Sequence, residues 1–290
     1  MVFTKGCVHL IGRRTQQTME LSRRKALALG AAAALLPTGT AQAATPPAIF
    51  YSPHQDDESL AMAGSIREHV EAGRKVVLVL LTRGENGGLL DIMNGTADCP
   101  LGTDCPGGGS HSFGLVQDDI VRGRTAEFTA AARRLGVDEI VRNRPDSAWG
   151  DYAGFVQEVR DTILEFEARY PGASHKLVNG YRDVIYGYPE DEPNLTHKAC
   201  REAAEGLDLD LRFYWVYGYT WPLEKRTADY VLPLSDKQFA RKRQALAEYS
   251  RWDPKRGRYA LGYHSVGTLM IDPAAADPRE YIDLPHSISR

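Results

Sequence analysis

The sequence predicts a single α/β domain with a mostly parallel sheet and helices on both faces. Three observations support this fold class. Strand and helix patterns alternate from about residue 48 to residue 220, as in chains of βαβ units. The run Val76–Leu81 (VVLVLL) is uninterrupted, which is typical of a strand buried on both faces of a parallel sheet. The composition, 43% hydrophobic and 25% charged over 290 residues, is that of a globular chain with a sizeable core.

The individual elements follow from local patterns. The expected strands are short apolar runs between turn residues: Ala48–Tyr51, Val76–Leu81, Glu139–Val141, Lys176–Asn179 and Arg212–Tyr219. The expected helices each have an apolar face at helical spacing: Ser59–Ala72, Asp118–Leu135, Tyr152–Arg169 and His197–Ala204. Gly73 and Gly136 are placed to end the first two helices. From about Trp221 the alternation is lost, and we predict a cap or edge elaboration of one domain over residues 44–290.

Residues 1–43 have the pattern of an export signal that is removed. A basic pair, Arg23-Arg24, precedes the apolar run Ala26–Leu36, and small residues end at Ala43, where cleavage is expected. The Ser-Arg-Arg opening and alanine-rich run resemble a twin-arginine signal. A structural amphipathic helix fits poorly, because the run has no polar face. We therefore predict an extracytoplasmic or secreted protein, with Met1 and Met19 as alternative starts.

Charge and hydropathy exclude several classes of partner. The formal net charge of -3 gives no indication of nucleic acid or an anionic membrane surface as a partner. No apolar stretch reaches the ~18–20 residues that span a bilayer. We therefore expect no transmembrane segment in the mature chain.

Two cysteines lie close together in the stretch DCPLGTDCPGGG. In an exported protein, Cys99 and Cys105 are predicted to form a disulfide that clamps this loop. The alternative, half of a zinc site, lacks a second pair of cysteines. Cys200 is expected to be a buried small residue on a helix.

The segment Arg83–Gln117 contains both of these cysteines and has almost no periodicity. Loops this long in compact domains are usually functional or disordered. A disulfide argues against disorder, so we expect a lid or wall that faces the substrate. Its glycines match neither phosphate-binding pattern.

A histidine and three carboxylates, in YSPHQDDESL, directly follow the first expected strand. Ligands of open α/β sheets bind beyond the carboxyl ends of the strands. His54 and Asp57 are three residues apart and can point to one side, whereas Asp56 points elsewhere. A zinc site for hydrolysis needs three protein ligands and an open position for water. The alternative is a helix start, where acidic side chains are favoured by the helix dipole.

A third ligand must come from another part of the chain. His197 is the best placed, because it follows the strand Lys176–Asn179 and opens a helix at the same sheet edge. His264, in the C-terminal segment, is a second candidate. A purely structural histidine at position 197 remains the alternative.

Four motifs in order resemble one known family. SPHQDDE, VLVLLTRGENGG, RGRTAEFTAAARRLGV and NLTHKA are similar to the motifs of the LmbE-like, or PIG-L, zinc-dependent N-deacetylases. These enzymes remove acetyl groups from N-acetylglucosamine units of small glycoconjugates. The resemblance implies a Rossmann-like three-layer sandwich, Zn²⁺ bound by His54, Asp57 and His197, and Asp56 as the general base.

One motif departs from the family pattern. Where the family commonly has His-Pro-Asp-His, this chain has Asn194 to His197 (NLTH). Asn194 can donate a hydrogen bond to an oxyanion but cannot act as an acid, so the leaving amine would receive its proton from Asp56 or, less simply, from His264.

Other positions in the motifs have a structural alternative. Arg83 is a candidate for binding a sugar hydroxyl or phosphate, with an ion pair to Glu85 as the alternative. Arg124 and Glu127, three residues apart, are expected to brace the fold as a helical pair.

The sequence thus predicts an exported, zinc-dependent N-deacetylase. Its expected substrate is an N-acetylglucosamine-type sugar in a glycopeptide, a cell-envelope glycan or a glycolipid. One alternative is a zinc amidase that cleaves a longer acyl group. Another is a non-catalytic carbohydrate-binding protein of the same fold, although such a protein has no need of the base Asp56.

Overall fold

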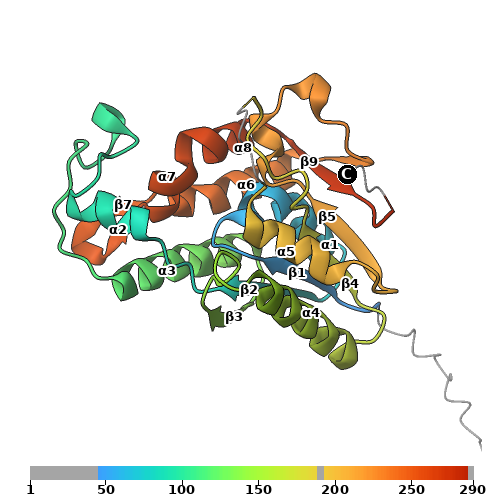
Figure 1. Cartoon of the computed structure of the whole chain (residues 1–290). Coiled ribbons are helices and arrows are strands. Elements are labelled where there is room, and N and C mark those ends of the chain that lie inside the picture. Colours follow the sequence, from blue (N-terminus) through green and yellow to red (C-terminus); the bar gives the residue numbers. More distant parts are fainter. Residues whose placement is uncertain (1–44, 188–192, 287–290) are drawn as a thin grey trace, which may run out of the picture. The chain divides into compact units, whose positions relative to one another are not determined.

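The computed structural model describes residues 45–187 and 193–286 (Figure 1). The predicted export signal, residues 1–43, lies outside the described residues. Among the helices described, none is both long enough and apolar enough to cross a membrane.

The described part of the chain is built on a seven-stranded sheet in the order β3-β2-β1-β4-β5-β9-β6. The five strands β1 to β5 are parallel: β1 (Ala48–Ser52), β2 (Val76–Thr82), β3 (Glu139–Arg144), β4 (Ser174–Val178) and β5 (Asp210–Tyr214). The strand order reverses at β1, which pairs with β2 on one side and β4 on the other. In open α/β sheets such a reversal is where ligands bind.

Helices cover both faces of this sheet (Figure 1). The connections β1-β2 and β2-β3 contain α1 (Ala63–Glu71) and α3 (Gln117–Leu135). The next two connections run in the opposite direction across the sheet and contain α4 (Tyr152–Arg169) and α5 (Leu195–Ala204). Because such crossovers are right-handed, the two pairs lie on opposite faces. The predicted three-layer α/β sandwich is confirmed.

The C-terminal part extends the sheet and covers one of its faces. Strands β6 (Tyr230–Pro233) and β9 (Arg279–Asp283) form the edge, with β9 antiparallel to both β5 and β6. Helix α6 (Asp236–Tyr249) packs against α1 and α3. The remaining elements are short: β7 (Trp252–Asp253), β8 (Arg258–Tyr259), α7 (Leu261–Val266) and α8 (Asp272–Ala276). This arrangement matches the predicted edge elaboration of one domain.

Two predicted elements differ in detail. The strand expected over Arg212–Tyr219 ends at Tyr214, because Tyr217–Thr220 winds into a 3₁₀ turn. The helix expected from Ser59 starts with a π-helical turn, Glu58–Met62, before α1. Such turns are rare and occur frequently at functional sites.

The segment Arg83–Gln117 is more ordered than the sequence suggested. It contains a helix, α2 (Gly87–Asn94), which Asn86 caps by accepting a 2.9 Å hydrogen bond from the amide of Leu89. Leu89 and Met93 of α2 bury their side chains against Ile120 and Leu261. The expectation of a long aperiodic loop was therefore wrong, because this small apolar cluster stabilises a helix that begins with two glycines.

The predicted disulfide is also wrong. Cys99 and Cys105 are both free thiols, and both are buried. Cys200 is buried on α5, as predicted.

Candidate metal centre and active site

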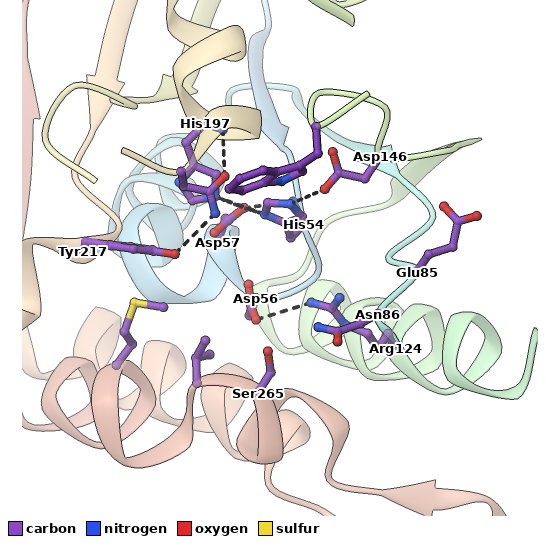
Figure 2. A pocket seen from close by; sticks show the side chains of 14 residues that line it. His54, Asp56, Asp57, Glu85, Asn86, Arg124, Asp146, His197, Tyr217 and Ser265 are labelled. Atoms are coloured by element: carbon purple, nitrogen blue, oxygen red, sulfur yellow. Dashed lines mark hydrogen bonds and ion pairs between the residues drawn. The ribbon is translucent and has the colours of Figure 1, made fainter. Parts of the chain in front are cut away.

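A pocket of about 350 Å³ opens at the strand-order reversal. Its residues come from the segments that follow the five parallel strands β1 to β5, and from α3, α5, α7 and the residues beside these helices (Figure 2). They are His54, Asp56, Asp57, Glu85, Asn86, Arg124, Asp146, Trp149, Asn194, His197, Tyr217, Ser265, Val266 and Met270. This volume suits a small ligand such as one sugar ring.

His54, Asp57 and His197 converge on one side of this pocket (Figure 2). His54 Nδ1 lies 3.1 Å from His197 Nε2 and 3.4 Å from Asp57 Oδ2. The third side of the triangle, from His197 Nε2 to Asp57 Oδ2, is 3.3 Å. The structure thus brings together the three residues that the sequence proposed as ligands.

The outer nitrogen of each histidine faces a carboxylate. His54 Nε2 donates to Asp146 at 3.0 Å, and His197 Nδ1 donates to Asp183 at 2.7 Å. These hydrogen bonds place the ring protons on the outer nitrogens, which leaves the lone pairs of the two inner nitrogens directed at the triangle. Metal-binding histidines show this arrangement, in which the carboxylate fixes the tautomer and raises ligand basicity.

The two carboxylates are themselves held in place. Asp146 accepts a second hydrogen bond from the Thr196 hydroxyl at 2.8 Å. Asp183 is fully buried and accepts from the amides of Val216 and Tyr217. The orientation of both rings is thereby fixed by the backbone of the sheet edge and by α5.

The triangle fits a divalent metal ion, zinc in particular. Tetrahedral zinc with bonds of about 2.0–2.2 Å to nitrogen and oxygen separates its ligand atoms by about 3.3–3.5 Å. The observed separations of 3.1–3.4 Å agree with this geometry. Although burial alone raises a carboxyl pKa, His197 and His54 hold the pKa of Asp57 well below its usual range, so this ligand is ionised. A divalent cation between these three atoms would be held by two nitrogen lone pairs and one carboxylate oxygen.

Asp56 is held in an uncommon backbone conformation beside the triangle. Its φ is 136°, a region that non-glycine residues rarely adopt and that clusters at functional sites. The carboxylate lies 3.7 Å from Arg124 Nη2. Burial and the charge of Asp57 raise the pKa of Asp56 to about 7, against the effect of Arg124. A carboxylate with a pKa near neutrality is suited to accept and return a proton.

Glu58 supports this turn from beneath. Its carboxylate accepts hydrogen bonds from the hydroxyls of Ser59 and Tyr249 at 2.5 and 2.6 Å, and from the amide of Asp56 at 3.3 Å. Burial raises the pKa of Glu58 to about 7. Glu58 is therefore more than a first-turn helix residue, because it anchors the strained turn that presents Asp56.

Asn194 lines the pocket and also begins α5. Its side-chain oxygen accepts from the amides of Thr196 and His197, at 3.0 and 3.2 Å. Its amide nitrogen donates to the Tyr217 hydroxyl at 3.3 Å. Because that hydroxyl accepts from Asn194, its own hydrogen is free to point toward a ligand in the pocket.

Two of the substrate-binding candidates lie elsewhere. Arg83 pairs with Glu85 and does not line the pocket, so the ion-pair alternative describes it better. His264 is buried against Cys105 and His111, away from the pocket wall.

The expected helical pair of Arg124 and Glu127 does not form. Arg124 faces Asp56 instead, and Glu127 accepts hydrogen bonds from the amides of Leu261 and Gly262.

The sequence interpretation missed Asp146, Asp183 and Tyr217. Asp146 follows β3 and Asp183 follows β4, so both stand beyond the carboxyl ends of parallel strands. His54 was proposed because it follows the carboxyl end of a strand, and the same criterion would have selected Asp146 and Asp183. Tyr217 lies in the 3₁₀ turn after β5, within an aromatic run whose other members are mostly buried in the core.

Comparisons with known proteins identify the family of the chain. The family model described as PIG-L: GlcNAc-PI de-N-acetylase matches residues 49–207, more than half of the chain. A 1D-myo-inositol 2-acetamido-2-deoxy-alpha-D-glucopyranoside deacetylase from Mycobacterium sp. (strain KMS) is 27% identical over 188 residues, which cover 59% of this chain and 54% of that protein. The chain thus spans about half the length of the curated relatives it matches.

Two solved structures share the fold. The A40926 pseudoaglycone deacetylase Dbv21 has a TM-score of 0.55 and 16% identity, covering 84% of this chain and 99% of that one. The zinc-inhibited form of the teicoplanin deacetylase Orf2 has a TM-score of 0.51 and 15% identity, covering 81% and 96%. The family match includes the lining residues from His54 to His197, and we conclude that the chain belongs to the PIG-L family.

Proposed function

We propose that the protein is a zinc-dependent deacetylase that hydrolyses the N-acetyl group of an N-acetylglucosamine-type sugar within a glycoconjugate. The observation that carries this proposal is the triangle of His54, Asp57 and His197 with a strained, buried Asp56 at its side. A binding protein needs neither the donor triangle nor the base. Family membership supports the same chemistry.

When bound, zinc lowers the pKa of a water ligand to about 7 and polarises the carbonyl of the acetamide. Asp56 then accepts the proton of the attacking water. Arg124 keeps the carboxylate oriented and partly ionised. The Tyr217 hydroxyl, which accepts from Asn194, is the donor placed to stabilise the oxyanion.

The leaving amine needs a proton, and Asp56 is the group that can return it. Asn194 has no titratable proton, and its oxygen is already occupied by the N-terminus of α5. His264 does not line the pocket. One carboxylate therefore serves as base and then as acid.

Substrate recognition is proposed at the rim. Trp149 lines the pocket, yet 67% of its surface is exposed. A large apolar ring at the mouth of a polar pocket provides a surface on which a sugar ring or an attached apolar group can pack. Two of the solved structures that share the fold are a deacetylase of the A40926 pseudoaglycone and a teicoplanin deacetylase, and the Mycobacterium relative is named as a deacetylase of an inositol-linked 2-acetamido-2-deoxyglucose.

The compartment is a separate proposal. The pattern of residues 1–43 supports export by the twin-arginine route, which would take the protein to substrates outside the cytoplasm. Fusion of these residues to a reporter, with Arg23→Lys and Arg24→Lys as the matched control, tests whether they direct export.

The test of the activity is acetate release from a panel of substrates by the zinc-loaded protein. The panel holds three N-acetylated substrates: inositol-linked N-acetylglucosamine, N,N'-diacetylchitobiose and an N-acetylated glycopeptide pseudoaglycone. Each is paired with an analogue that carries a longer acyl group. We expect release from at least one N-acetyl member, and its loss in Asp56→Asn with ligand binding retained. Binding of these sugars without hydrolysis in the native protein would favour the carbohydrate-binding alternative, and preference for the longer acyl group would favour the amidase alternative.

A further inference from the structure

A second cluster of metal-binding side chains lies outside the pocket. It consists of Cys99, Cys105, His111 and His264, and all four are buried. Each residue contributes one potential ligand atom, a nitrogen or a sulfur, and these four atoms all lie within 4.8 Å of one another. Cys105 Sγ is 3.4 Å from His111 Nε2 and 3.3 Å from His264 Nε2.

His264 presents a free lone pair to the sulfur, and a nitrogen of His111 lies equally close to it. His264 Nδ1 donates to the carbonyl of Ala260 at 2.9 Å, so its Nε2 is unprotonated. His111 Nδ1 is buried and has no hydrogen-bond partner among the described residues. Both rings are buried, an environment that favours the neutral imidazole that a metal ligand must be.

Both cysteines are buried, and one of them accepts a hydrogen bond from the backbone. The amide of Gly107 donates to Cys105 Sγ at 3.4 Å. A buried thiolate needs a cation to neutralise its charge, and a metal ion held between these side chains would supply it.

We propose that Cys99, Cys105, His111 and His264 form a second metal site, a tetrahedral Cys₂His₂ centre that holds a structural zinc ion. Zinc bonds of about 2.3 Å to sulfur and 2.0–2.1 Å to nitrogen separate sulfur from nitrogen by about 3.5 Å. The two observed separations, 3.3 and 3.4 Å, are close to this value. Two thiolates, two neutral imidazoles and Zn²⁺ have no net charge, and binding releases the two thiol protons.

The site is structural because its four protein ligands fill the coordination shell, whereas a catalytic zinc keeps one position open. Its place in the fold indicates that it connects two segments of the chain. Three ligands come from the segment between α2 and α3, and the fourth comes from α7. His264 directly precedes Ser265 and Val266, which line the pocket. The second metal therefore ties the chain after α2 to the helix that forms one wall of the active site.

Metal content and cobalt spectroscopy test this proposal without reference to activity. The native protein, purified under reducing conditions, is expected to hold about two zinc ions per chain, one for each site. After exchange for Co²⁺, thiolate ligation gives an intense sulfur-to-cobalt charge-transfer band in the near ultraviolet. The site of His54, Asp57 and His197 has no sulfur and cannot produce this band.

Variants assign the two ions. Each of the variants Cys105→Ala and His264→Ala is expected to lose one equivalent of zinc. The cobalt form of Cys105→Ala is also expected to lose the charge-transfer band. His197→Ala is expected to lose the other equivalent and to retain the band. Cys200→Ala, which removes a buried cysteine elsewhere, is the matched control and keeps both ions.

The spectrum of the native protein decides the question even if a variant fails to fold. A cobalt form without the charge-transfer band would overturn the proposal. In protein purified without reductant, a mass lower by two protons with no zinc at this site would also overturn it, because that would show a disulfide. The proposed deacetylase activity is unaffected by either result, since it depends on the other metal and on Asp56.

Discussion

The two histidines of the triangle owe their tautomers to single carboxylates. Asp146 holds the proton of His54 on Nε2, and Asp183 holds that of His197 on Nδ1. Neither carboxylate touches the ion directly in the proposed site. Each nevertheless decides whether a lone pair or a proton points at the metal, so both act as positioning residues.

Asp146→Asn tests this role. The asparagine amide is expected to weaken the hold on the His54 tautomer and to lower zinc affinity by about 10- to 100-fold, with a smaller loss of activity at saturating zinc. Competition with a chelator measures the affinity. Asp161→Asn, on the exposed side of α4, is the control and keeps native affinity. Equal zinc affinity in native protein and Asp146→Asn would show that His54 does not need this partner.

Tyr217 is the residue to test for oxyanion stabilisation. Tyr217→Phe removes only the hydroxyl that Asn194 orients. Because the hydroxyl is used in the transition state, kcat is expected to fall by about 100- to 1000-fold with little change in KM. Steady-state kinetics on the substrate found in the panel provide the measurement. A rise in KM at constant kcat would instead mean that the hydroxyl binds the ground-state sugar.

At the scale of elements, helix α5 places a ligand and depends on its first residue. Asn194 satisfies two amides of the first turn, one of which belongs to His197. The family's common histidine at this position is thus replaced by a good N-cap residue. Thr196, in place of the family's aspartate, binds Asp146. At both positions where the motif departs from the family pattern, the side chain therefore supports one of the two histidines proposed as metal ligands.

Asn194→Ala is expected to lower the free energy of unfolding of the metal-free protein by about 1 kcal/mol, the usual contribution of an N-cap side chain. Asn194→Asp is the matched variant, because aspartate caps a helix equally well and should restore stability. Denaturant unfolding of both variants gives the comparison. If alanine has no effect, the cap does not hold the helix start and other contacts must fix His197.

The sequence predicted the elements whose patterns are local. Helix α4 was predicted to the residue, and the run that became β2 was placed within one residue, because each has a strong period and clear end signals. Helix α2 was missed, since its apolar residues pack on α3 and α7, which lie far along the chain. The disulfide was predicted from proximity in sequence, whereas the histidines that complete the cysteine cluster come from positions 111 and 264.

The candidate site was predictable only in part: its three proposed ligands were, and the carboxylates behind them were not. His54, Asp57 and His197 could be proposed because they follow strands or open a helix at one sheet edge. The carboxylates behind them could not be paired with particular rings, because the pairing depends on strand order. Asp146 after β3 reaches His54 after β1, across a strand that lies between them in the sheet.

At the scale of the whole molecule, charged side chains occur both at the edge and in the middle of the sheet. The carboxyl ends of the strands gather the charged groups of the site at the order reversal. Lys176, by contrast, lies in the middle of the central strand β4, is paired with Phe50 of β1, and is almost completely buried. Its ammonium group donates to Ser174 at 2.8 Å, which compensates only part of the lost hydration.

This buried lysine predicts how stability depends on pH. Burial lowers the pKa of Lys176 from 10.5 to about 8, against the favourable charge of Asp210. Below pH 8 the folded and unfolded chains both hold the proton, and the penalty of burying the charge is fully present. Between about pH 8 and pH 10.5 the unfolded chain holds more protons than the folded one, so this group makes stability rise with pH.

Lys176→Met removes that penalty while keeping a long apolar side chain. We expect the variant to be more stable than the native protein at pH 7, by on the order of 2–3 kcal/mol at most. The advantage should shrink steadily as the pH is raised from 8 toward 10. Denaturant unfolding across this range, with the exposed Lys255→Met as control, measures the difference. A difference that stays constant with pH would mean that Lys176 remains charged in the folded protein, with Asp210 and Ser174 supplying enough compensation to hold its proton.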